Sequence, residues 1–192
     1  MMAEVVVDVL NSALGVTEPF GPEVPAGSHA IEVGSTRVAA KNATFVFRVF
    51  GRPPRTSACD CERASEPALP QMLYLMADQA VLDKLRGTMT AGKGEARADG
   101  RLAKLFRSKL TDNEMLDELF LATLTRYPSE AERKHFTTWR KDRKTIPMNP
   151  SDPPKKVKGQ PDNSLAGLSE RELAFVDVLW ALINTREFIL NH

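Results

Sequence analysis

The sequence predicts a mainly α-helical fold, an irregular multi-helix domain with a long Pro/Gly-rich N-terminal loop and at most a few short strands. Apolar residues recur at helical spacing along several segments, and one helix-start pattern occurs three times. This pattern is the capping box: the hydroxyl of the residue before the helix accepts a hydrogen bond from the amide of the third helical residue. The carboxylate of that third residue accepts in return from the amide of the cap residue. The three pairs are Thr111 with Glu114, Ser129 with Glu132, and Ser169 with Glu172.

The N-terminal part begins with a segment of helical spacing and continues into a loop. Residues 3–14 predict a helix that ends at Gly15, although the run of valines inside it is also compatible with a strand. Residues 16–42 hold three prolines and several glycines, so we expect an ordered loop. Within that loop, brief extended pieces are expected around residues 30–33 and 37–39.

The middle of the chain carries a stronger helical signal. A short apolar element over residues 44–50 ends at Gly51, because two prolines follow and cannot continue a helix. From Pro67 the apolar residues again recur at helical spacing. One expected helix carries a stripe of Leu69, Met72, Leu73 and Met76, and a second lies around Leu82 and Leu85. After a Gly-rich break at 92–100, two more helices are expected over residues 101–109 and 111–126.

The C-terminal part combines a polar segment with an apolar helix. Residues 145–168 are rich in proline and lysine and predict a flexible surface excursion. The last helix, from Ser169 to Asn184 or beyond, is apolar nearly all round. Such a helix belongs in an interior, so the chain either returns to its own core or buries this helix against a partner. We expect residues 1–192 to form one domain.

The composition excludes several function classes. With 42% hydrophobic and 27% charged residues and a net charge of +1, the chain is typical of globular proteins. Lys and Arg together number 26 against 25 acids, so the basic balance of a nucleic-acid-binding protein is missing. No apolar run is long enough to span a membrane, and the N-terminus does not have the pattern of a signal peptide.

Cys59 and Cys61 are the candidate metal ligands. Nearby arginines would favour the thiolate form. A structural zinc site needs about four ligands, so a distant histidine (His29, His135 or His192) would have to join the two cysteines. A local disulfide requires a bent backbone at this spacing. Thiols packed in a turn remain the favoured interpretation of the three.

The arginines around the two cysteines form a second candidate site. Arg52, Arg55 and Arg63, together with Glu62, predict either an anion-binding site or an internal salt-bridge network. We favour the network, because arginine commonly serves structural pairing. The acids of residues 112–118 lie in the first turns of a capped helix, where they complement its dipole. The catalytic residues, if there are any, stay unknown.

Several motifs resemble a planctomycete family, domain of unknown function 1553. They are Phe50-Gly51-Arg52-Pro53-Pro54-Arg55, Cys59-Asp60-Cys61-Glu62-Arg63, Ser65-Glu66-Pro67, Ala3-Glu4-Val5, Leu119 to Arg126 followed by Pro128, Leu179-Trp180-Ala181-Leu182-Ile183-Asn184, Glu187-Phe188 and Asn191-His192. The resemblance implies the C-terminal part of a large exported protein, in an extracytoplasmic setting, with a c-type cytochrome domain upstream. Any haem would belong to that upstream part, since this chain has no Cys-x-x-Cys-His motif.

The first functional expectation is a structural or protein-interaction module. It would dock on the upstream domains of the parent protein, on another exported protein, or on a second copy as a homo-oligomer. The alternative is a redox or metal-binding module centred on Cys59 and Cys61, and no other cofactor is expected in this chain. A part in polysaccharide breakdown rests on the family setting alone.

Overall fold

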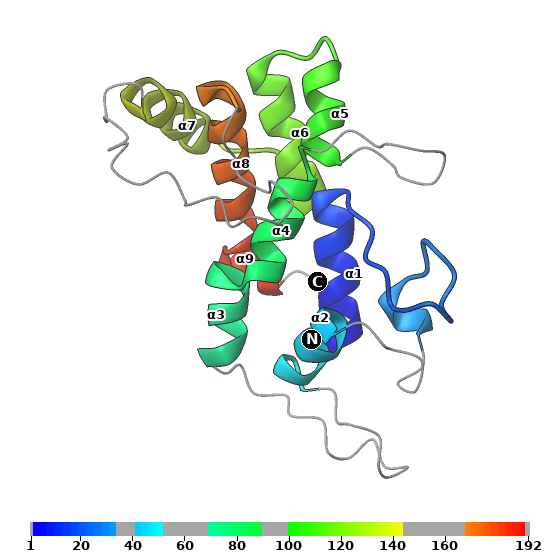
Figure 1. The fold of residues 1–192 in the computed structure, drawn as a ribbon. Helices are drawn as coiled ribbons and strands as arrows, with labels where there is room; N and C mark the ends of the chain where they lie inside the picture. The colour runs from blue at the N-terminus through cyan, green and yellow to red at the C-terminus, as the bar shows by residue number, and fades with distance from the viewer. Residues whose placement is uncertain (1, 34–40, 52–68, 90–99, 144–167, 191–192) are drawn as a thin grey trace, which may run out of the picture.

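The computed structural model describes residues 2–33, 41–51, 69–89, 100–143 and 168–190 (Figure 1). Across these ranges the regular structure is helical and contains no strand, which confirms the mainly α-helical prediction. The elements are α1 (Ala3–Leu14), the 3-10 helix η1 (Ala30–Glu32), α2 (Lys41–Val49), α3 (Leu69–Ala77), α4 (Gln79–Gly87), α5 (Arg101–Arg107), α6 (Asp112–Leu124), α7 (Glu130–Arg143), α8 (Glu170–Ile183) and α9 (Arg186–Leu190). The predicted excursion at 145–168 lies almost wholly outside the described residues.

The core forms where α1, α6 and α8 meet their neighbours. α1 contacts α2, α4, α5 and α6, while α8 contacts α4, α6 and α9. The buried apolar residues of these helices form one cluster. Its largest fully buried side chains include Leu10, Leu14, Met115, Leu116, Leu119, Phe175, Leu179 and Ile183. Each such side chain contributes on the order of 1.5–3 kcal/mol through its removal from water.

The apolar last helix is packed inside the chain's own core. Phe175 of α8 is completely buried and touches Phe106 of α5 edge to face, with ring centroids 5.6 Å apart. The same ring lies 5.3 Å from that of Phe136 in α7. α8 therefore joins α5, α7 and α6 into one body, and the first of the two alternatives for this helix is confirmed.

All three predicted capping boxes are present. The hydroxyl of Thr111 accepts from the amide of Glu114 at 3.4 Å, and the Glu114 carboxylate accepts from the amide of Thr111 at 2.7 Å. The same reciprocal pair forms at the starts of α7 and α8. Each box satisfies amides that the helix itself leaves unpaired, so the three helix starts are fixed by local sequence.

Two expectations for the N-terminal part differ from the structure. Residues 30–32 form η1 rather than an extended piece, because the carboxylate of Asp8 in α1 accepts from the amides of Ala30 at 2.6 Å and Ile31 at 3.0 Å. The apolar element at 44–50 is the helix α2, which begins earlier, at Lys41. The piece expected at 37–39 lies outside the described residues.

The C-terminal end of α1 is capped by a side chain from α5. Gly15 adopts a left-handed conformation with φ of 63°, and a Cβ at this position would lie 2.9 Å from the backbone nitrogen of Arg101. Arg101 donates from Nε to the carbonyl of Ala13 at 2.6 Å and from Nη2 to that of Ser12 at 2.7 Å. A cation at a helix C-terminus satisfies free carbonyls and complements the dipole, so α1 and α5 are held end to end.

Candidate functional site

The site residues predicted from the sequence cannot be placed together. Cys59, Cys61, Arg52, Arg55, Glu62 and Arg63 all fall within 52–68, outside the described residues. His29 and His135, two of the three histidines considered as further metal ligands, have exposed side chains. Among the described residues, no group of three or more His, Cys, Asp and Glu side chains is arranged to hold a metal ion. The metal site at the two cysteines therefore stays a prediction.

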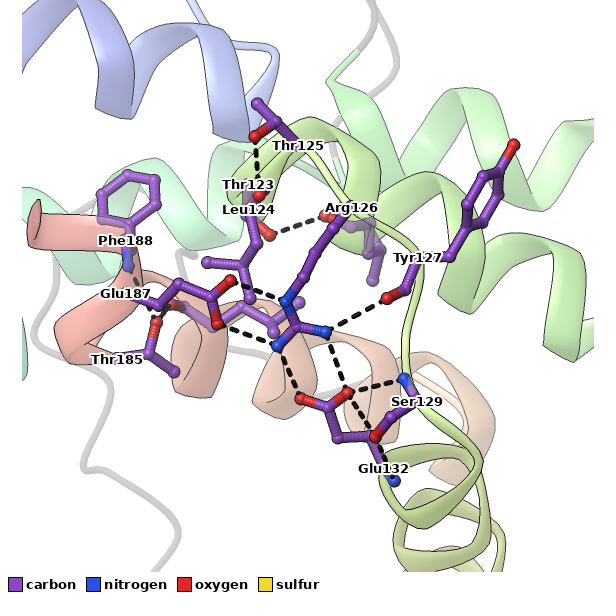
Figure 2. A network of polar contacts seen from close by, with 12 residues as sticks. Thr123, Leu124, Thr125, Arg126, Tyr127, Ser129, Glu132, Thr185, Glu187 and Phe188 are labelled. Atoms are coloured by element: carbon purple, nitrogen blue, oxygen red, sulfur yellow. Dashed lines mark hydrogen bonds and ion pairs between the residues drawn. The ribbon is translucent and has the colours of Figure 1, made fainter. Parts of the chain in front are cut away.

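The densest polar arrangement in the described part of the chain surrounds Arg126 (Figure 2). Its Nε and Nη2 donate to the two carboxylate oxygens of Glu187 at 2.6 and 2.8 Å. Its Nη2 and Nη1 donate to the two oxygens of Glu132 at 2.8 and 2.9 Å. Nη1 also donates to the carbonyl of Tyr127 at 3.1 Å. One guanidinium therefore binds two carboxylates in bidentate geometry, and we call these three charged residues the Arg126 cluster.

The Arg126 cluster joins three elements that are distant in sequence. Arg126 follows the end of α6, Glu132 lies in the first turn of α7, and Glu187 lies in α9, 61 residues further along the chain. Thr125, at the end of α6, adopts a left-handed conformation with φ of 56°. The αL conformation ends α6 at the residue before Arg126, and the guanidinium also lies over the ring of Phe120, 5.3 Å from its centroid.

The electrostatics of the cluster follow from these hydrogen bonds. The hydrogen bonds from Arg126 lower the pKa of Glu132 to about 2, and burial opposes this shift only in part. The same guanidinium lowers the pKa of Glu187. In return, the two carboxylates raise the pKa of Arg126 above its ordinary value. All three side chains are therefore charged at neutral pH, and the cluster carries a net charge of −1.

The chemistry available to the Arg126 cluster is structural. A guanidinium has five N–H groups, and the five hydrogen bonds above engage the three nitrogens that carry them. Glu132 accepts in addition from the amide and the hydroxyl of Ser129, at 2.7 and 2.8 Å. Because these groups are occupied by one another, the cluster offers no donor with which to bind a substrate anion. It acts as a clamp between helix ends.

The acids of residues 112–118 do more than complement a helix dipole. Asp112 pairs with Arg140 of α7 and Arg171 of α8, the latter at 2.6 Å. Asp117 pairs with Arg133 of α7 at 2.5 Å. Arg171 also stacks on the ring of Phe106, 5.0 Å from its centroid. The sequence predicted correctly that these acids lie at the start of a helix. Their partners lie on other helices, so the residues around the acids do not indicate which arginines they bind.

An apolar surface on α3 is the other feature that stands out. Leu69, Met72, Leu73 and Met76 are 68%, 57%, 53% and 48% exposed, and we call these four residues the α3 face. They are spaced at i, i+3, i+4 and i+7, so they form one stripe along the helix. The opposite side of α3 is buried through Tyr74 and Leu75. The stripe that predicted this helix therefore points away from the core.

The surroundings of the α3 face extend its apolar character. α3 lies at the periphery of the helical assembly, at the lower left of Figure 1. Phe45 of α2 is 43% exposed, and its ring lies 6.2 Å from that of Tyr74. Burial raises the pKa of the Tyr74 phenol, so this side chain stays neutral on the buried side of α3. No charged residue occurs anywhere in Leu69–Ala77.

Comparisons with known proteins yield no match, whether against protein-family models, curated proteins or solved structures. In the part of the chain that the structure describes, none of the helices combines the length and the apolar character needed to cross a membrane.

Proposed function

We propose that this chain is a protein-interaction module that docks through the α3 face. The observation that carries the proposal is that α3 is apolar on both sides, although only one side is buried. A helix that is apolar all round is normally enclosed on every side. Contiguous apolar patches of this kind on a folded protein mark interaction surfaces.

The proposal changes which helix contacts the partner. The sequence suggested α8, but α8 packs into the chain's own core, with Phe175, Leu179 and Ile183 fully buried. These three side chains are therefore not available for docking.

The setting of the module follows from the resemblance described above, and it is part of the proposal. A member of the family of domain of unknown function 1553 would be the C-terminal part of an exported planctomycete protein. Its partner would then be the upstream domains of the parent protein, another exported protein or a second copy of the chain. The proposal is supported by the α3 face and is independent of whether the family assignment holds.

Site-specific photo-crosslinking tests the docking surface. A photoreactive phenylalanine analogue replaces Met72 in the full-length protein, expressed in its native host, and adducts are identified by mass spectrometry. The control carries the same analogue at Tyr127, which is 63% exposed and lies between α6 and α7. We expect a discrete adduct from position 72 and none from position 127. Equal labelling at both positions, or none at either, would contradict the proposal.

The redox or metal-binding alternative concerns Cys59 and Cys61 and has its own test. Elemental analysis and thiol titration of the purified chain separate its outcomes. Bound metal, or a pair of highly reactive thiols, would favour this alternative. Two unreactive thiols without metal would remove it.

A further inference from the structure

We infer that the partner of the α3 face is a second copy of the same chain, with two α3 helices packed antiparallel across a twofold axis. This inference rests on the proposed function and names the partner for that same surface. It is argued from the charge, the geometry and the area of the face.

The charge of α3 suits contact with its own copy. Across a twofold axis, a charged side chain near the axis lies close to its own copy and is repelled by it. A surface that contacts itself is therefore favoured when such charges are absent or lie away from the axis. Leu69–Ala77 contains no Asp, Glu, Lys or Arg. The first charged residue after the helix is Asp78, at its C-terminal end. In an antiparallel pair Asp78 would lie beside the N-terminal end of the partner's α3, where the helix dipole favours an anion.

The spacing of the face gives a unique antiparallel register. When the two helices run in opposite directions about an axis between positions 72 and 73, Leu69 of one copy lies opposite Met76 of the other. Met72 then lies opposite Leu73. Every exposed residue of the stripe thereby meets an apolar residue of the partner, and no polar side chain of α3 enters the contact. The flexible thioethers of Met72 and Met76 can fill gaps between the branched leucines.

The area of the face fits a weak to moderate dimer. Four apolar side chains that are about half exposed form a patch of the size that is often functional on a monomer, about 300–600 Å². Two such patches in contact remove roughly 1,000 Å² from water, which is the lower bound for a specific interface. An interface of this size lies at the low end of the range for specific contacts, so we expect a reversible dimer and not an obligate one.

The oligomeric state and a charge substitution test the inference. Sedimentation velocity of the purified chain over a range of concentrations should show a monomer–dimer equilibrium. Leu73→Glu places two carboxylates near the axis and should weaken dimerisation at least 100-fold, whereas Tyr127→Glu should leave it unchanged. Far-UV circular dichroism of both variants confirms that they remain folded. A dimer that persists in Leu73→Glu would overturn the inference, because the contact would then lie elsewhere.

Disulfide pairing tests the register. In a background with Cys59→Ser and Cys61→Ser, Leu69→Cys and Met76→Cys variants are oxidised separately and as a mixture. The antiparallel register predicts a disulfide-linked pair in the mixture only. A link between two copies of the Leu69→Cys variant would show a parallel contact and overturn the geometry.

The results separate this inference from the proposed function. A monomer at all concentrations, with a photo-adduct from position 72 to a different protein, would overturn the second copy and leave the docking surface in place. A monomer without any adduct would overturn both. An adduct to the chain itself, with a concentration-dependent dimer, supports both.

Discussion

Replacement of Arg126 by methionine tests whether the Arg126 cluster clamps the ends of α6, α7 and α9. Methionine keeps much of the side-chain length but removes the charge and all five donors. Glu132 and Glu187 would then face each other without a cation between them. We expect the free energy of unfolding to fall by at least ~1.5 kcal/mol.

The magnitude follows from the exposure of the partners. The side chains of Arg126, Glu132 and Glu187 are 37%, 37% and 33% exposed, so solvent screens each ion pair. A partly exposed pair contributes up to about 1 kcal/mol, and its bidentate geometry places the pair of Arg126 with Glu132 at the upper end of that range. The pair with Glu187 stabilises the cluster in the same direction. Loss of the guanidinium from the ring of Phe120 adds about 0.5 kcal/mol.

The assay is urea-induced unfolding followed by far-UV circular dichroism. Arg126→Lys serves as the matched control, because it keeps the charge but cannot bind two carboxylates in bidentate geometry, and it should lose about half as much stability. A double-mutant cycle with Glu187→Gln should show that the two side chains are coupled, because each substitution removes the same ion pair. A loss below about 0.5 kcal/mol in Arg126→Met would show that the cluster is not a clamp.

Three further predictions concern pH, close packing and capping. Because the folded-state pKa of Glu132 lies at about 2, below its ordinary 4.5, its stabilising contribution is complete above pH 4.5 and is lost as pH falls toward 2. The stability difference between the wild type and Arg126→Met, measured by urea titration at each pH, should therefore shrink by ~1 kcal/mol over this range after allowance for screening. A difference that stays constant with pH would contradict this prediction. Gly100→Ala should cost about 2–3 kcal/mol in thermal unfolding, because its Cβ would lie 2.4 Å from the carbonyl oxygen of Gly87. Gly87→Ala, whose Cβ would lie 3.5 Å from a methyl carbon of Val16 and closer to no other neighbour among the described residues, is the control and should be near neutral. Thr111→Ala removes the cap hydroxyl of α6 and should cost ~1 kcal/mol by the same measurement, while an unchanged midpoint would mean that the helix start is held by its packing alone.

The parts of the fold that could be predicted are those encoded locally. The capping pairs at Thr111, Ser129 and Ser169 act within four residues, so the sequence pattern alone locates the helix starts. The apolar periodicity likewise indicated α1, α6 and α8. It could not say which side of α3 would be buried, because Tyr74 and Leu75 on the opposite side are as apolar in character as the stripe.

The parts that could not be predicted depend on partners far apart in the chain. Residues 30–32 form a 3-10 helix because Asp8 binds their amides from α1, which no window around those residues reveals. Glu132 was recognisable as a capping residue through Ser129, but nothing nearby in sequence points to Arg126 binding Glu187 across 61 residues. Sequence spacing can identify ion pairs within a helix, but pairs between helices require the tertiary arrangement.

The position of α8 in the core has a consequence for synthesis on the ribosome. The side chains that fill the centre, Phe175, Leu179 and Ile183, are supplied by the last long helix of the described chain. Until that helix has left the exit tunnel, the apolar side chains of α6 that pack against α8 stay exposed to solvent and prone to aggregation. Chains that stop before residue 170 should therefore be substrates for chaperones and proteases rather than folded products.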